Sequence, residues 1–287
     1  MRQHKLSTGK TILMIAAAIM IVAAAQVFAM TAAEAAVSLG LPAVAGNLLA
    51  GILYPVAAIG LVFLLCRKII KITTNECKIT KFSLKPVWCM TAVLMPAMVS
   101  ITLICTNGHW ENNGMDRAGT AALVVGTVMY YGIGTGIVEE IAFRGLIMSA
   151  LEYRFNKAVA VIAPSVLFGA MHIIGNDLDA RSTVQLLTAG SIVGILLSLV
   201  AYESGNIWNG ALIHAVWNIV DGILHIGNSA YHGAVYNYVL DTDSFLLTGG
   251  DFGIEASIVS VGAYMLFIVL VLVLCRKKNT GKDMRNT

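Results

Sequence analysis

Long apolar runs alternate with short polar segments along the whole chain. Each run is close to the roughly 20 residues that a helix needs to cross a bilayer. The runs predict eight spans, at about 11–29, 44–66, 87–105, 119–153, 158–174, 184–202, 207–226 and 254–275. No linker divides the series, so we expect an all-α polytopic membrane bundle in which residues 1–287 form one domain.

The first run has two interpretations. Lys5 and Lys10 precede an Ala-rich stretch that ends near Ala29, as they would before either a span or a signal peptide cleaved there. The run is long for the apolar region of a signal peptide, which favours a retained span. The cleaved form stays an alternative.

Composition agrees with a membrane protein. The chain is 57% hydrophobic and only 12% charged, with a mean hydropathy of +0.79, whereas soluble domains are roughly 25% charged. A net charge of +3 that gathers at the borders of the spans gives no reason to expect nucleic acid as a partner. The five cysteines form no CxxC pair, so neither a disulfide framework nor a thiolate metal site is indicated.

The distribution of lysine and arginine predicts the topology. With the N-terminus in the cytoplasm, seventeen of these residues fall on the cytoplasmic side, if Arg144 is included, and only Arg117 and Arg181 fall outside. We therefore expect a multi-pass protein with both termini cytoplasmic and with membrane lipids as partners. In the absence of organelle signals, the plasma membrane is the expected location.

The fourth run is too long for one straight span, and it contains the glycine-rich segment 132–136. Glycines in membrane bundles let neighbouring helices approach closely. Alternatively, they break the helix and open backbone groups beside Glu139, as broken helices do at other membrane sites. The outside segment 227–253 is likewise open to two interpretations, a lid or a plain surface loop.

Two carboxylates and a guanidinium lie inside the fourth run. Charges at bilayer depth cost at least about 2.5–3.5 kcal/mol each, so they are usually paired or functional. Glu140 and Arg144 are four residues apart and can pair on one helix face, which a purely structural role would explain. Glu139 lies about 100° round the helix without a partner in its own segment. An unpaired buried carboxylate suits a general base.

Two later spans each carry polar groups at helical spacing. Phe168 and His172 share one face, and so do His214 and Asn218. Glu139 and His172 each lie 16 residues from the turn at 155–156, so both sit about 24 Å along antiparallel helices and face each other. We expect water and substrate to reach this site from the cytoplasmic side.

These three segments resemble the EExxxR, FxxxH and HxxxN motifs of the CAAX protease and bacteriocin-processing (CPBP, or Abi) family of intramembrane endopeptidases. The motifs occur here in the family's order, over residues 138–218, which we take as the catalytic core. The resemblance implies that Glu139 is the catalytic glutamate and that His172 shares its water. His214 and Asn218 would stabilise the oxyanion, and Glu140, Arg144 and Phe168 would support them.

The expected activity is hydrolysis of a peptide or lipidated-protein substrate by an activated water, with no cofactor required. A zinc-dependent version would use Glu139, His172 and His214 as ligands, although the chain has no HExxH motif and Asn218 is a poor zinc ligand. A transporter or scaffold would use the same buried polar residues, extended by Asp221 and His225. Residue types alone do not distinguish the metal-independent protease, the zinc-dependent protease and the transporter or scaffold.

Overall fold

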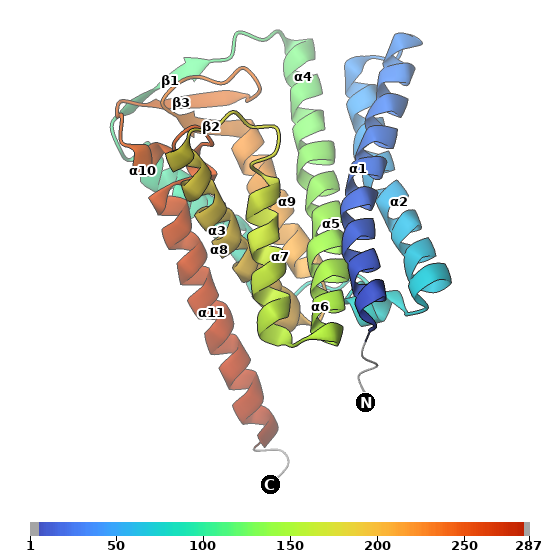
Figure 1. Cartoon of the computed structure of the whole chain (residues 1–287). Coiled ribbons are helices and arrows are strands. Elements are labelled where there is room, and N and C mark those ends of the chain that lie inside the picture. Colours follow the sequence, from blue (N-terminus) through green and yellow to red (C-terminus); the bar gives the residue numbers. More distant parts are fainter. Residues whose placement is uncertain (1–5, 284–287) are drawn as a thin grey trace.

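A small sheet caps one end of a bundle of eight helical rods (Figure 1). The computed structural model describes residues 6–283 and is 75% helical, which confirms the all-α polytopic bundle. Each predicted run forms one rod: α1 (Thr8–Ser38), α2 (Ala43–Leu64) with η1 (Leu65–Ile70), α3 (Pro86–Ile104), the long helix 117–154, α7 (Lys157–Met171), α8 (Ala180–Ser204), α9 (Trp208–Ile223) and α11 (Ile258–Asp283).

Six of these rods are long and apolar enough to cross a membrane by length and composition. The helices α7 and α9, with 15 and 16 residues, are shorter than a full span. Polar residues follow α7 directly, and Asp179 then starts α8 by accepting a hydrogen bond from the Ser182 backbone N–H at 2.6 Å. That bond lowers the pKa of Asp179. The expected count of eight full spans is therefore not reached among the described residues.

The small sheet lies at the end of the bundle away from both termini (Figure 1). It consists of β1 (Gly108–Asn112), β2 (Leu224–Gly227) and β3 (Tyr236–Leu240), in the order β1-β3-β2. The central strand β3 is antiparallel to β1 and parallel to β2. The Tyr238 hydroxyl donates to the Ile104 and Thr106 carbonyls at 3.0 and 2.8 Å, which joins the sheet to α3. The segment 227–253 thus contains a strand as well as the short helix α10 (Phe245–Thr248).

The long helix 117–154 runs without a break. It consists of α4 (Arg117–Val125), the π-helix η3 (Gly126–Gly134), α5 (Thr135–Glu140), the π-helix η4 (Ile141–Ile147) and α6 (Met148–Arg154). The alternative interpretation of the glycines, a helix break, is therefore wrong, because the chain widens its turns there instead of leaving the helix.

The glycines allow the long helix to approach α9 closely. A Cβ added to Gly136 would lie 2.9 Å from the Ala215 backbone nitrogen and 3.0 Å from the Ala211 oxygen. A Cβ on Gly132 would overlap the Ile219 side chain. Both contacts are with α9, so these glycines let α5 and η3 pack directly on the helix that carries His214.

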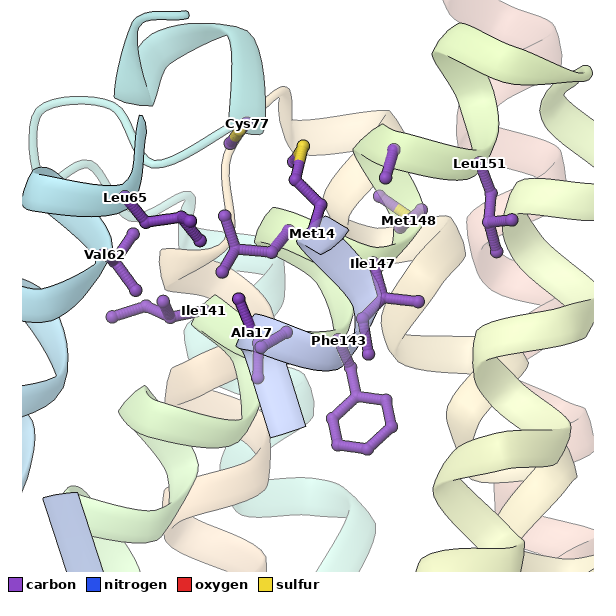
Figure 2. Close-up of a cluster of buried hydrophobic side chains, with 14 of the residues drawn as sticks. Met14, Ala17, Val62, Leu65, Cys77, Ile141, Phe143, Ile147, Met148 and Leu151 are labelled. Carbon is purple, nitrogen blue, oxygen red and sulfur yellow. The ribbon is translucent and has the colours of Figure 1, made fainter. Parts of the chain in front are cut away.

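A buried apolar cluster fills the end of the bundle that holds the termini. Figure 2 shows its side chains converging from the first two rods and from η4. Most of them are nearly inaccessible to solvent, and the labelled members are Met14, Ala17, Val62, Leu65, Cys77, Ile141, Phe143, Ile147, Met148 and Leu151. We call this set the lower cluster. The helix α1 contributes to it, as a retained first span would.

Basic residues surround the same end. Ion pairs of 2.9 Å between Lys78 and Glu152, and of 2.7 Å between Lys85 and Glu203, lie there. Of the residues whose side chains are described, twelve lysines and arginines lie at this end: Lys10, Arg67, Lys68, Lys71, Lys78, Lys81, Lys85, Arg154, Lys157, Arg276, Lys277 and Lys278. Only Arg117 and Arg181 lie at the sheet end. The fold thus gathers the charges as the predicted topology requires.

Replacing Gly136 by alanine is expected to destabilise the bundle by about 1–3 kcal/mol, the usual cost of overpacking. The added methyl group meets backbone atoms of α9, which cannot rotate away. Thermal unfolding of the detergent-solubilised protein measures the effect. The control is Gly60→Ala in α2, where a Cβ meets nothing within 4 Å. Equal melting temperatures for the two variants would contradict the prediction.

Candidate active site

A cavity of about 1260 Å³ lies inside the bundle, at the level of the glutamate pair. Its walls come from α1, α2, the long helix, α7, α8 and α9, and from the segment between β2 and α11. All four residues predicted to be catalytic line it, together with Phe168: Glu139, His172, His214 and Asn218. The fold thus brings the three motifs to one enclosed space.

A chain of polar contacts crosses the bundle beside this cavity. Arg144 Nη1 donates to Glu140 Oε1 at 2.6 Å, as the spacing predicted, and Arg144 Nη2 donates to the Gly194 carbonyl at 3.2 Å. The His214 Nδ1 atom lies 3.3 Å from the same Glu140 oxygen. Glu140 and Arg144 are 0% and 1% exposed. Because a carboxylate only accepts, Nδ1 of His214 carries a hydrogen.

Glu139 is placed differently from its neighbour. Its Oε2 atom lies 3.8 Å from His214 Nε2, beyond hydrogen-bond distance, and has no hydrogen-bond partner among the described residues. The side chain keeps 20% of its surface exposed, and the residue lines the cavity. Two successive carboxylates therefore have different surroundings: Glu140 is paired with Arg144, whereas Glu139 lines the cavity.

His172 lies just beyond the last residue of α7. Its Nδ1 atom is 2.7 Å from the Phe168 carbonyl, so that nitrogen carries the hydrogen and Nε2 holds a lone pair. No ion pair within 4 Å joins His172 to Glu139 in the part of the chain described. The direct facing that we expected is thus replaced by a shared cavity, in which His214 is the histidine near Glu139.

The Phe168 ring lies among the charged and polar groups. It is 4.6 Å from the Arg144 guanidinium carbon, 4.6 Å from the His172 ring and 5.8 Å from the His214 ring. An arginine over an aromatic face gains cation–π attraction in a desolvated site. Phe168 therefore supports the arginine and fixes the space between the two histidines.

Asn218 is 4% exposed and faces the long helix. Its side-chain amide donates to the Tyr131 carbonyl of η3 at 3.0 Å. An amide nitrogen has two hydrogens, so one remains for a ligand. The contact fixes the amide plane at the cavity wall.

Several cavity residues were not predicted as site residues. Asp221 continues the face of His214 seven residues later, which is the signal that suggested a polar file. Glu255 accepts a hydrogen bond from Trp217 Nε1, and the Phe252 ring lies 6.2 Å from the His172 ring. Both precede α11, and Phe252 lies within 227–253, so that segment contributes to the cavity wall and is more than a plain surface loop. No local pattern marks Glu255 or Phe252.

The residues proposed as zinc ligands do not form a ligand set. Within residues 6–283, no group of three or more His, Cys, Asp or Glu side chains is arranged to hold a metal ion. Glu139 Oε2 and His214 Nε2 are 3.8 Å apart, but no ion pair within 4 Å joins His172 to Glu139 in the described residues. The donor arrangement does not fit the predicted Glu139, His172 and His214 site.

Comparison with known proteins identifies the core. The family model described as Type II CAAX prenyl endopeptidase Rce1-like matches residues 120–220. This match assigns the core of the chain to the CAAX protease family. The matched segment holds all three motifs. No curated protein and no solved structure matches the chain. With its apolar helices and this match to a membrane protease family, the chain is a multi-pass membrane protein, and the matched family implies intramembrane endopeptidase activity.

Replacing one member of the buried ion pair is expected to be far more damaging than replacing both. Glu140→Gln leaves Arg144 uncompensated and should cost about 3–5 kcal/mol, whereas Glu140→Gln combined with Arg144→Met should recover much of that loss. Thermal unfolding in detergent measures both. The matched control is Glu139→Gln, which removes a carboxylate that has no hydrogen-bond partner at Oε2 and should leave the melting temperature close to that of the wild type.

Proposed function

We propose that this CAAX protease hydrolyses a peptide bond with a water molecule activated by Glu139. The observation that carries the proposal is the placement of Glu139: the residue lines the cavity, and its buried Oε2 atom, which has no hydrogen-bond partner among the described residues, lies 3.8 Å from Nε2 of His214. A general base must reach the proton that it removes, and Glu139 lines the cavity beside His214.

Two groups assist the water in this scheme. Glu139 removes one proton from it, and Nε2 of His172 accepts a hydrogen bond from the other hydrogen. The resulting hydroxide forms a bond to the carbonyl carbon of the substrate. The proton held by Glu139 passes to the leaving nitrogen as the C–N bond breaks, so no covalent enzyme intermediate is formed.

The oxyanion is stabilised from the α9 side. Asn218 donates its remaining amide hydrogen, and His214 donates from Nε2 when both ring nitrogens carry hydrogen. Fixed donors in a cavity that excludes bulk water stabilise developing charge better than water does. Arg144 acts through Glu140, which holds the His214 ring in place; both are positioning residues.

The substrate is a peptide or lipidated protein that reaches the cavity within or at the membrane. The matched family is named for the cleavage of prenylated CAAX ends. A site inside the bundle suits a segment that leaves water before it is cut. This scheme assigns no role to a metal ion.

Glu139→Gln and His172→Ala are expected to lower cleavage of a membrane-delivered peptide by about 10²-fold or more, the usual contribution of a positioned base. Purified protein in proteoliposomes, with peptide products measured by mass spectrometry, provides the assay. Asp177→Asn, on the exposed loop after α7, is the control and should cleave normally. Ion flux that depends on Glu139, with no peptide ever cut, would show a transporter instead.

Chelation is expected to leave the rate of cleavage unchanged. The reason is the lack of three convergent ligands in the described chain. The test treats active protein with a strong chelator and measures metal content by elemental analysis. Stoichiometric zinc, or activity lost on chelation and restored by zinc alone, would establish the metalloprotease version.

A further inference from the structure

The cavity has its mouth at the sheet end of the bundle. Its lining from α1 begins only at Gln26 and continues to Ser38, the half of that helix nearest the sheet. The strand-end segments around Tyr231 and Asp251 add further wall. The lining residues Glu34, Asn176, Tyr231 and Asp251 are exposed to solvent and form a rim.

The opposite end of the cavity is closed. Its floor is made by Phe168, Leu197 and Ile213, which are 4%, 1% and 0% exposed. Beyond the floor, the lower cluster packs buried apolar side chains of the first two rods, η4 and α6 against one another. Among the described residues, water and substrate therefore have no path from that end, which is the end that the predicted topology places in the cytoplasm.

The distribution of lysine and arginine indicates on which side of the membrane the cavity opens. The terminal end of the bundle carries the lysines and arginines, and this end is cytoplasmic by the positive-inside rule. The sheet end, with Arg117 and Arg181 alone, then lies outside the cytoplasm. Peptides made for use in the cytoplasm would not meet this mouth.

The walls of the cavity are acidic. Five carboxylates line it: Glu34, Glu139, Asp221, Asp251 and Glu255. No lysine or arginine is among the described lining residues. A CAAX sequence lies at a C-terminus and ends in a carboxylate, which meets these five carboxylates and no lysine or arginine among the described lining residues. A segment with positive charge meets complementary walls.

We propose that the substrate is a positively charged segment of a polypeptide outside the cytoplasm, which enters the cavity at the sheet end. This inference rests on the proposed peptidase function and narrows its substrate class. A cytoplasmic prenylated C-terminus is the alternative that it replaces.

The side of access is tested with a membrane-impermeant bulky maleimide on intact cells and on inverted membrane vesicles. The background lacks the native cysteines. Asn176→Cys lies at the rim, and Lys81→Cys, exposed at the opposite end, is the control. We expect Asn176→Cys to react in intact cells and to lose cleavage relative to its own unmodified form. Lys81→Cys should react only in inverted vesicles and keep its cleavage.

Reaction of Asn176→Cys only in inverted vesicles, or loss of cleavage on modifying Lys81→Cys, would overturn the proposal. Labelling does not depend on catalysis. It therefore shows from which side of the membrane the rim is accessible even in a Glu139→Gln background. Failure of the unmodified protein to cut any peptide would instead count against the proposed function.

Substrate charge is tested with matched peptides that carry lysine, glutamine or glutamate beside the scissile bond. The lysine peptide should have the lowest KM, and Asp221→Asn should raise that KM by up to about fivefold, the size of a partly exposed ion pair. The glutamine peptide should not respond, and neither should the Asp177→Asn control. Preference for the glutamate peptide or for a free C-terminal carboxylate would overturn the assignment.

Discussion

The contact between Arg144 and Glu140 is the constraint on which the rest of this bundle depends. Both groups are fully buried, so each is tolerable there only through the other. The guanidinium also reaches the Gly194 carbonyl of α8, and the carboxylate reaches His214 of α9. One ion pair thus sets how three helices lie relative to one another, and the cavity is the space that this arrangement leaves.

Such short polar links require helices that approach very closely. A Cβ on Gly190 would lie 2.7 Å from the Gly169 Cα, and one on Gly194 would lie 2.8 Å from the Ser165 Cα. These contacts hold α7 against α8, as Gly136 holds α5 against α9. Small residues provide the packing that membrane helices use in place of a hydrophobic driving force. The charged contacts and the small residues therefore depend on each other.

Sequence spacing predicted the depth of each side chain along its helix. It did not predict how each helix is rotated about its own axis. The apolar runs predicted every helical rod, and the i,i+4 spacing predicted the ion pair between Glu140 and Arg144. Counting residues placed Glu139 and His172 at one depth, but depth carries no information on rotation about the helix axis. His214, set by α9 packing, is consequently the histidine near Glu139. Glu255 and Phe252 come from irregular backbone without any periodic signal.

The two π-helical stretches, η3 and η4, flank the glutamates on either side. A π turn takes up more residues than an α turn, so it changes the phase of the helix without interrupting it. Each residue rotates the following side chains by about 100°. The number of residues between Gly126 and Gly134 therefore sets the direction in which the Glu139 side chain points. Deleting one residue there would leave the composition almost unchanged but would turn Glu139 away from the cavity.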